Sequence, residues 1–313
     1  MTNVRRFLPN VKFTNTPASL VSLVLPLGVL AVSTAAIFIR LADAPGVVVA
    51  FYRMLIASVL LLPWTLRSLA RTPLTFQNAP YTILAGLCLA VHFATWISSL
   101  SYTSVTASAA LVNTNPLWVA LFSWLFLGLA PPLTVLIGAV LAVLGGALIG
   151  FDGSGVGSQP ALGNALALVG AISVSAYLLL GRAAQRRGLA VQAYAGSAYA
   201  VAALALLPLP LVFDVPYAPY PVATWGWLLL LALVPQMIGH TSFNYAMNHV
   251  EPTLVATVIL LEPIGAAIMA LIIFEEVPSL LTAIGAGVLL VGVILTARNT
   301  RSTVEVVNEQ GER

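Results

Sequence analysis

The sequence predicts an all-α polytopic membrane protein with ten transmembrane helices, arranged as two inverted five-helix repeats around a central cavity. Three observations support this fold class: an apolar composition, a regular series of apolar segments and an internal duplication. Of the 313 residues, 60% are hydrophobic and 7% are charged, whereas about a quarter of the residues in soluble domains are charged. The lipid bilayer is therefore the first partner that we expect for this chain.

The internal duplication becomes visible when the sequence is shifted against itself by 147 positions. The shift aligns Pro116 with Pro263, Pro131 with Pro278, Leu133 with Leu280, Gly138 with Gly285, and Gly145 with Gly292. Proline and glycine are common in membrane helices, so each match alone is weak. Five matches at one offset are hard to attribute to composition, and we interpret them as two halves of similar design.

Segments long enough to span a membrane follow one another along the chain. A bilayer core requires about 20 apolar residues per helix, and we expect spans at residues 18–41, 46–66, 80–100, 106–129, 133–151, 161–181, 191–212, 225–245, 253–274 and 280–297. Five spans fall in a first repeat, residues 18–152, and five in a second, residues 161–298. A Gly- and Ser-containing linker at residues 153–160 joins them. Residues 1–17 and 299–313 form the expected tails.

The charges of the loops predict the orientation. Arg and Lys fall in the two tails and in the loops after the second and sixth spans, whereas the opposite loops contain Asp and Glu but neither Arg nor Lys. The positive-inside rule then places both termini in the cytoplasm, and we expect a multi-pass membrane protein. Because five spans is an odd number, the second repeat enters the membrane upside down. Inverted repeats are typical of secondary transporters, which bind substrate at the midplane between the repeats.

Other function classes are disfavoured. The 13 basic residues are scattered at segment ends, which fits a membrane-flanking role better than a nucleic-acid partner. Cys88 is the only cysteine, so neither an intrachain disulfide nor a thiolate metal cluster can form. His92 and His240 lack the neighbours of an H-E-x-x-H motif, and Cys88 has no evident activating neighbour. We therefore expect no metal, no cofactor and no enzyme activity, and the inverted repeat disfavours a channel or a receptor.

Glu262 is the most informative polar residue within an apolar segment. An acid in the middle of a span costs about 2.5–3.5 kcal/mol on insertion scales, and Pro263 is expected to kink the helix because its ring clashes with the carbonyl of Ile259. Glu262 can line a cavity and exchange a proton with a transport cycle, or it can be a structural acid bonded to a neighbouring helix. Its match in the first repeat is Asn115, followed by Pro116. We expect Pro116 and Pro263 to act as hinges.

Polar side chains also recur at helical spacing in the third and eighth spans. Gln236, His240 and Asn244 stand at i, i+4 and i+8, which is one helix face. His92 and Trp96 stand at i and i+4 in the corresponding span of the first repeat. A histidine in an apolar helix is usually a packing residue. Two histidines in equivalent helices are equally compatible with packing and with a polar chamber that both of them line.

The remaining candidates lie in the second, fourth and sixth spans. Asn113 and Asn115 can satisfy backbone groups freed by the expected kink or contact a substrate. Arg53 can bind a carboxylate bidentately, or it can pair with an acid or with helix carbonyls. The predicted substrate-binding residues are His92, Trp96, Asn113, Asn115, Tyr177, Gln236, His240, Asn244, Glu262 and Arg53.

A stripe of small residues runs along the fifth span. Gly138, Ala142, Gly146 and Gly150 recur every four residues and make a flat face that another helix can approach closely. We favour packing inside the bundle, and a dimer interface is the alternative. The expected state is accordingly a monomer or a weak homodimer.

With these residues in view, the chain resembles the drug/metabolite transporter superfamily, in particular its branch with paired EamA repeats. The resemblance covers nearly all of residues 18–298 and rests on residues 45–53, on Asn115-Pro116 with the run from Gly138 to Gly145, and on residues 261–263 and 274–276 with the run from Gly285 to Gly292. The chain is most similar to bacterial exporters of aromatic and other amino acids, of the YddG type. The resemblance implies ten helices, cytoplasmic termini, a location in the bacterial inner (cell) membrane and a cavity that opens alternately to each side. One departure is that the acid present as Glu276 is replaced by Leu129 in the first half.

These observations predict a secondary transporter that exports amino acids, aromatic and other neutral ones, or similar small metabolites by alternating access. A chamber of aromatic residues, amides and one or two charges suits a small-molecule substrate with an ammonium, a carboxylate and an apolar side chain. Export of lipophilic cations or drugs is the alternative, because Glu262 and the aromatic residues would serve it equally. Phosphorylated substrates fit less well, since they would need several Lys or Arg in the spans.

Overall fold

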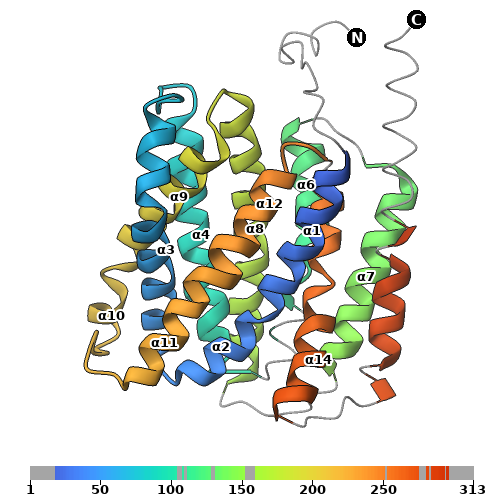
Figure 1. The fold of residues 1–313 in the computed structure, drawn as a ribbon. Helices are drawn as coiled ribbons and strands as arrows, with labels where there is room; N and C mark the ends of the chain where they lie inside the picture. Colours follow the sequence, from blue (N-terminus) through green and yellow to red (C-terminus); the bar gives the residue numbers. More distant parts are fainter. Residues whose placement is uncertain are drawn as a thin grey trace, which may run out of the picture.

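The computed structural model describes residues 18–103, 108, 111–127, 131–151, 159–250, 252–274, 280–281, 283–292 and 294–295. Within these ranges every regular element is a helix (Figure 1). The expected tails, residues 153–158 of the expected linker and the acids Glu275 and Glu276 lie outside the described residues.

The helices of the first half follow the five expected segments. They are α1 (Ala18–Ser33), α2 (Ala35–Ala42), α3 (Gly46–Leu69), α4 (Ala79–Ser99), α6 (Asn115–Leu127) and α7 (Leu133–Phe151). Helices α1 and α2 together form the first span, which is interrupted at Thr34.

The second half repeats this order. Its helices are α8 (Pro160–Arg186), α9 (Val191–Leu206), α10 (Leu209–Val212), α11 (Val222–Leu231), the π-helix η2 (Ala232–His240), α12 (Thr241–Ala246), α13 (Pro252–Ile259) and α14 (Glu262–Phe274). A further apolar helix covers Ala283–Gly292.

Seven helical segments of the described chain are long and apolar enough to cross a bilayer, and three shorter apolar helices accompany them. The shorter ones are Asn115–Phe126, Leu133–Leu148 and Ala283–Gly292. The prediction of an all-helical multi-pass membrane protein is therefore confirmed.

Several predicted spans differ from the observed helices in detail. The sixth span was expected to end at residue 181, before Arg182, but α8 continues to Arg186. The fourth and ninth spans were expected to bend at Pro116 and Pro263, and each is interrupted by a turn where α6 and α14 begin. Hydropathy gives the length of an apolar segment and does not register a turn made of apolar residues, such as Leu260-Leu261.

The two halves interleave in the bundle. Helix α1 of the first half packs against η2, α12 and α14 of the second, while α6 packs against α8 and α13. Helices α4 and α3 pack against α9, and α4 runs along α8 (Figure 1). Residues from both halves therefore enclose the centre of the molecule.

The fifth helices of the two halves cross at their glycines. A methyl group at Gly145 would meet the backbone of Leu289 and Gly285, and one at Gly292 would meet the backbone of Gly138 and Ala142. The predicted packing inside the bundle is thus confirmed for Gly138 and Ala142. Gly146 was expected on the same face, but a methyl group there would meet nothing within 4 Å.

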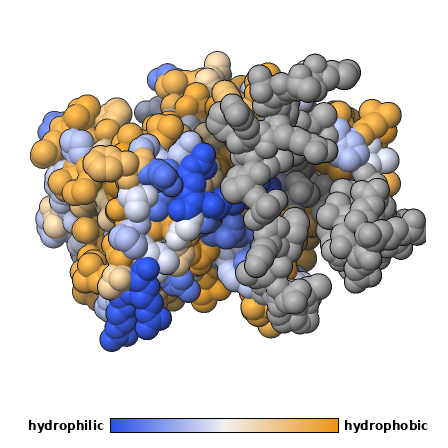
Figure 2. Space-filling model, turned by 90° about the horizontal axis from the view of Figure 1, so that it is seen from above, coloured by the Kyte–Doolittle hydropathy of each residue, from blue (hydrophilic) through white to orange (hydrophobic). Residues whose placement is uncertain are grey.

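The sides of the bundle are apolar, and one of its ends is more polar (Figure 2). Large hydrophobic side chains such as Leu30, Phe126 and Leu204 are exposed, which is expected of residues that face lipid tails. Figure 2 looks down on the end of the bundle that is uppermost in Figure 1. It shows hydrophilic residues there, with hydrophobic residues around them.

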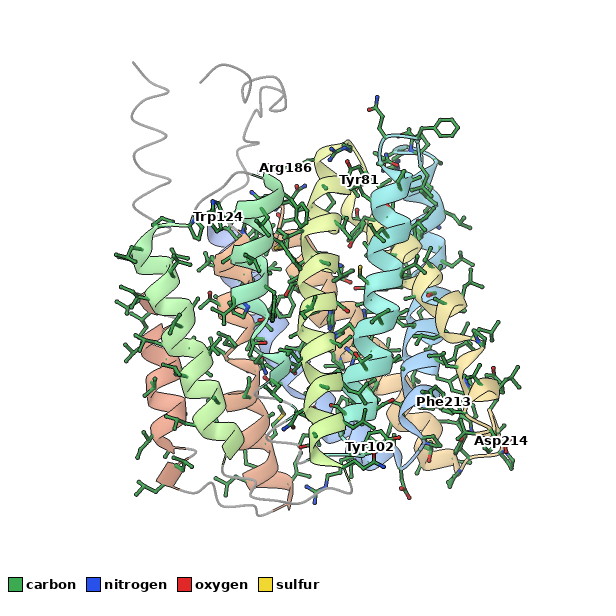
Figure 3. All side chains as sticks on the ribbon, turned by 180° about the vertical axis from the view of Figure 1, so that it is seen from behind. Tyr81, Tyr102, Trp124, Arg186, Phe213 and Asp214 are labelled. Atoms are coloured by element: carbon green, nitrogen blue, oxygen red, sulfur yellow. The ribbon has the colours of Figure 1, made fainter. Side chains whose placement is uncertain are left out.

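Arginine-containing loops meet at one end of the bundle. The Arg187 guanidinium lies 4.1 Å above the Tyr81 ring, and the Ala190 N–H donates to Thr72 Oγ1 over 3.2 Å. These contacts bring together the loops that follow α3 and α8. Figure 3 shows Tyr81 and Arg186 at this end, with Asp214 at the opposite end, in agreement with the expected separation of charge.

Candidate functional site

A small cavity lies inside the bundle where the two halves meet. It is lined by Val32, Ala35, Arg53, His92, Trp96, Val112, Asn113, Asn115, Val174, Leu178, His240, Phe243, Ile259 and Glu262. Seven of the ten predicted site residues are among these, and the other three, Tyr177, Gln236 and Asn244, are buried. The cavity volume is about 40 Å³, whereas ligand pockets measure about 300–1,000 Å³. The cavity must therefore widen before it can hold a metabolite.

Two matched helix breaks contribute to the cavity wall. Helix α13 ends at Ile259 and α14 begins at Glu262; likewise a turn at residues 113–114 precedes Asn115, the first residue of α6. Pro263 and Pro116 hold the second position of the new helix, where a missing N–H is not needed because the first four N–H groups have no partner within the helix. The interruption lies where the kink was expected, and it takes the form of a short turn between two helices.

At each break a serine from the opposite half contacts the backbone. Ser33 Oγ of α1 lies in donor position 3.2 Å from the carbonyl oxygen of Glu262, and Ser175 Oγ of α8 lies 3.1 Å from the carbonyl oxygen of Asn115. The two contacts are reciprocal, because the first helix of each repeat contacts the fourth span of the other. We call Ser33 and Ser175 the break serines.

Two histidines approach each other across the cavity. His92 Nδ1 lies 2.9 Å from the Gly170 carbonyl oxygen, which can only accept, so this nitrogen carries a proton. The His92 ring stacks on Trp96 with 5.7 Å between ring centroids and lies 6.4 Å from the His240 ring. The geometry agrees with the shared polar chamber, although His240 aligns with Phe93 rather than with His92 at the offset of 147.

Arg53 is fully buried and held from two sides. Its Nε donates to Gln236 Oε1 over 2.9 Å, and its guanidinium carbon lies 4.2 Å above the Phe93 ring. A cation stacked on an aromatic ring away from water gains about 2 kcal/mol. The partner of Nε is an amide, where the sequence suggested an acid or helix carbonyls.

Gln236 lies in the π-helix η2, which contains Pro235. Such segments occur frequently at functional sites. The wider turn means that Gln236, His240 and Asn244 do not form the regular stripe expected of an α-helix. Gln236 contacts Arg53, His240 lines the cavity, and Asn244 Nδ2 donates to Tyr177 Oη over 2.6 Å. Tyr177 and Asn244 therefore support the wall from behind.

The cavity wall itself is built from equivalent positions of the two halves. Trp96 and Phe243, Val112 and Ile259, and Asn115 and Glu262 are each separated by 147 positions, and Val32 and Val174 by 142. The sequence analysis missed the apolar members of these pairs and both break serines. A second offset of 142 for the first helix of each half would have found Val174 and Ser175.

No group of three His, Cys, Asp or Glu side chains in the described part of the chain could hold a metal ion. The cavity thus offers two charged side chains, two histidines, two asparagines and an indole, surrounded by apolar side chains. Such an arrangement can bind a small amphiphilic molecule through charge and hydrogen bonds.

The sequence pattern of the EamA-like transporter family matches the chain twice, at residues 19–151 and 161–298. A solved crystal structure of a protein has the same fold, with a TM-score of 0.75 and 19% identity, over 91% of this chain and 99% of that one.

Three relatives match over most of their length. An uncharacterized transporter of Archaeoglobus fulgidus is 30% identical over 79% of this chain and 86% of its own. The pseudopaline exporter CntI of Pseudomonas aeruginosa is 26% identical over 83% and 89%. A probable terminal-alkyne amino-acid exporter of Streptantibioticus cattleyicolor is 27% identical over 74% and 78%.

Proposed function

Because the chain belongs to the EamA-like transporter family, we propose that it exports amino acids, aromatic and other neutral ones, or similar small metabolites through the cavity between its two repeats. The protein is an integral membrane transporter and not an enzyme. A small-molecule substrate and the lipid bilayer are its partners.

The observation that carries this proposal is the cavity between the repeats, which contains both Arg53 and Glu262. Buried charges inside a membrane protein are costly and typically line substrate pathways. Two of the similar proteins are named as exporters, one of pseudopaline and one, as probable, of a terminal-alkyne amino acid. Both names support export as the direction of transport, and the second supports an amino acid as the substrate.

The proposed topology has ten spans in two inverted repeats, residues 18–152 and 161–298, with both termini in the cytoplasm of a bacterial cell. The two arginine-containing loops that meet at one end of the bundle support this orientation. The protein acts as a monomer or a weak homodimer, since Gly138 and Ala142 already pack inside the bundle.

Transport proceeds by rocking of the two repeats about the cavity. The breaks before Pro116 and Pro263 serve as hinges, because a turn between two half-helices bends more easily than a continuous helix. The cavity is smaller than a metabolite requires, and movement at the breaks widens it. The ten predicted residues provide its polar wall or support that wall.

Export of lipophilic cations is a second candidate. Glu262 faces a cavity that also contains Trp96 and Phe243, and a carboxylate beside aromatic rings suits an organic cation. Arg53 in the same cavity argues against it, because an added cation would lie near an existing one.

Counterflow in proteoliposomes separates these functions. Liposomes containing the purified protein are loaded with one unlabelled compound and receive the labelled compound outside. The panel is a set of neutral amino acids, tetraphenylphosphonium and a sugar phosphate. Saturable counterflow of amino acids supports the proposal; counterflow of tetraphenylphosphonium alone supports the second candidate, and absence of amino-acid counterflow refutes the first.

A further inference from the structure

Several buried polar atoms at the cavity have no hydrogen-bond partner. Among the described residues, the unpartnered donors here are Arg53 Nη1, Trp96 Nε1 and Gln236 Nε2. Asn115 Oδ1 is an unpartnered acceptor, and His240 Nδ1 also lacks a partner. Buried polar groups are nearly always satisfied in folded proteins, so such a cluster indicates bonds that a ligand completes.

The donors form one pole of the cavity. Gln236 Oε1 and the Phe93 ring hold the Arg53 guanidinium in place, and its Nη1 stays available. Trp96 lines the same cavity, and its indole nitrogen can only donate. A carboxylate accepts several such bonds at once, and a fixed guanidinium is suited to bind it.

The acceptors form the other pole, at the two helix breaks. The side chains of Glu262 and Asn115 line the cavity there. An ammonium group has three N–H donors and no acceptor, so it suits this pole.

Part of the cavity wall is apolar. It is formed by Val32, Ala35, Val112, Val174, Leu178, Phe243 and Ile259, and the wall also contains the polar side chains of His92, Asn113 and His240. The apolar side chains offer no hydrogen bond to a polar substituent, and desolvating such a substituent against them would be costly. This part of the wall therefore favours a hydrocarbon or aromatic substituent.

From this arrangement we propose that the cavity binds free α-amino acids with apolar side chains as zwitterions, with the carboxylate held by Arg53 and Trp96 of the first repeat and the ammonium by Glu262 of the second. This inference rests on the proposed function and narrows it. A substrate bound at both ends links the two repeats, which a molecule with one charged end does not.

Charge balance explains why one charged end is insufficient. Arg53 and Glu262 line the same cavity and carry opposite charges. A zwitterion lying between them gives each charge an opposite partner. An amine without a carboxylate leaves Arg53 unmatched, and an acid without an ammonium leaves Glu262 unmatched, and a buried unmatched charge is strongly unfavourable.

Competition measurements test whether the site recognises both the carboxylate and the ammonium group of the substrate. Counterflow of labelled phenylalanine is measured in proteoliposomes against excess phenylalanine, phenethylamine or phenylpropionate, which share the aromatic ring and differ in their charged groups. We expect each single-charge analogue to compete at least about tenfold more weakly than phenylalanine, the effect of losing a hydrogen bond to a charged group. Equal competition by either analogue overturns the inference while leaving amino-acid export intact. Absence of counterflow for phenylalanine and for the other neutral amino acids refutes the proposed function as well.

Variants then test which residues bind the carboxylate and which bind the ammonium group. With Glu262→Gln, phenethylamine should lose its remaining competition while phenylpropionate keeps its own; with Arg53→Gln, the pattern should reverse. Trp96→Phe gives this position the residue of its repeat counterpart, Phe243, and should weaken phenylpropionate more than phenethylamine. A general structural defect would weaken both analogues alike. Parallel loss in all three folded variants, or the opposite assignment of the poles, overturns the inference.

Discussion

The break before Asn115 and the break before Glu262 can be compared residue by residue. In both, a turn interrupts an apolar span, a proline occupies the second position of the restarted helix, and a serine of the opposite repeat contacts the carbonyl oxygen of the first residue. The backbone construction is therefore the same. The side chain offered to the cavity is a neutral amide in one repeat and a carboxylate in the other.

The features that the two breaks share support the fold, and the feature in which they differ determines what the cavity can bind. The break serines and the crossing glycines occur in both repeats because both must restart a helix and pack their fifth helices closely. The cavity itself needs only one acid opposite Arg53, since a second would leave a buried charge unmatched. The duplication thus provides two similar hinges. The difference between Asn115 and Glu262 places a negative charge on only one side of the site.

The largest expected effect follows from making the two breaks chemically alike. Glu262→Asn should lower the initial rate of amino-acid counterflow by about tenfold or more, because the substrate ammonium loses a charged partner. Asn115→Ala removes a neutral partner and should cost about two- to tenfold. Both rates are measured in proteoliposomes at equal protein content. Equal losses at the two positions would mean that the acid has no special role.

Substitutions of the glycines where the fifth helices cross should have the next largest effect, on stability. Gly145→Val and Gly292→Val each force a side chain against a facing backbone, and overpacking of this kind costs about 1–3 kcal/mol. Each should lower the unfolding temperature in detergent by several degrees. Gly146→Val and Gly287→Val are matched controls, because a methyl group at either position meets nothing within 4 Å. If all four variants lose the same stability, helix propensity and not the crossing is responsible.

The smallest effect is expected at the break serines. Ser33→Ala and Ser175→Ala each remove a hydroxyl group whose single proton is shared between a carbonyl of its own helix and a carbonyl of the opposite repeat. A hydrogen bond between helices of a membrane protein is worth about 0.6 kcal/mol, so each loss should not exceed this value. Because the contacts are equivalent, the two losses should match, and the double variant should show their sum. Unfolding in detergent measures this directly. A stability loss confined to one serine would contradict the equivalence of the breaks.

The sequence was sufficient to predict the spans and the duplication, and insufficient for the local geometry of the site. Apolar length located the helical segments of the described residues, seven of them long enough to span a membrane and three shorter, and the offset of 147 paired Asn115 with Glu262. Whether Pro263 kinks a helix or begins one could not be predicted, since proline is compatible with both and the deciding turn is made of leucines. The bond between Arg53 and Gln236 depends on how α3 packs against η2, which periodicity within one helix does not determine.

The break serines illustrate a different limit. A serine within an apolar span usually bonds its own helix, and both do so here, Ser33 to Val29 and Ser175 to Ala171. Their additional contacts with the opposite repeat become apparent only when the two repeats are seen together. Residues that support a site from another part of the chain have no local signal in the sequence.

Alternating access through this cavity can be tested most directly at Val112 and Ile259, equivalent residues beside the two breaks that both line the cavity. Cys88 is the only cysteine, so Cys88→Ser gives a cysteine-free background for Val112→Cys and Ile259→Cys. A membrane-impermeant thiol reagent is applied from either face, with and without a transported amino acid. Alternating access predicts labelling of both positions from both faces and protection by the amino acid. Labelling from one face only, or labelling that the amino acid leaves unchanged, would contradict a transport site between the two repeats.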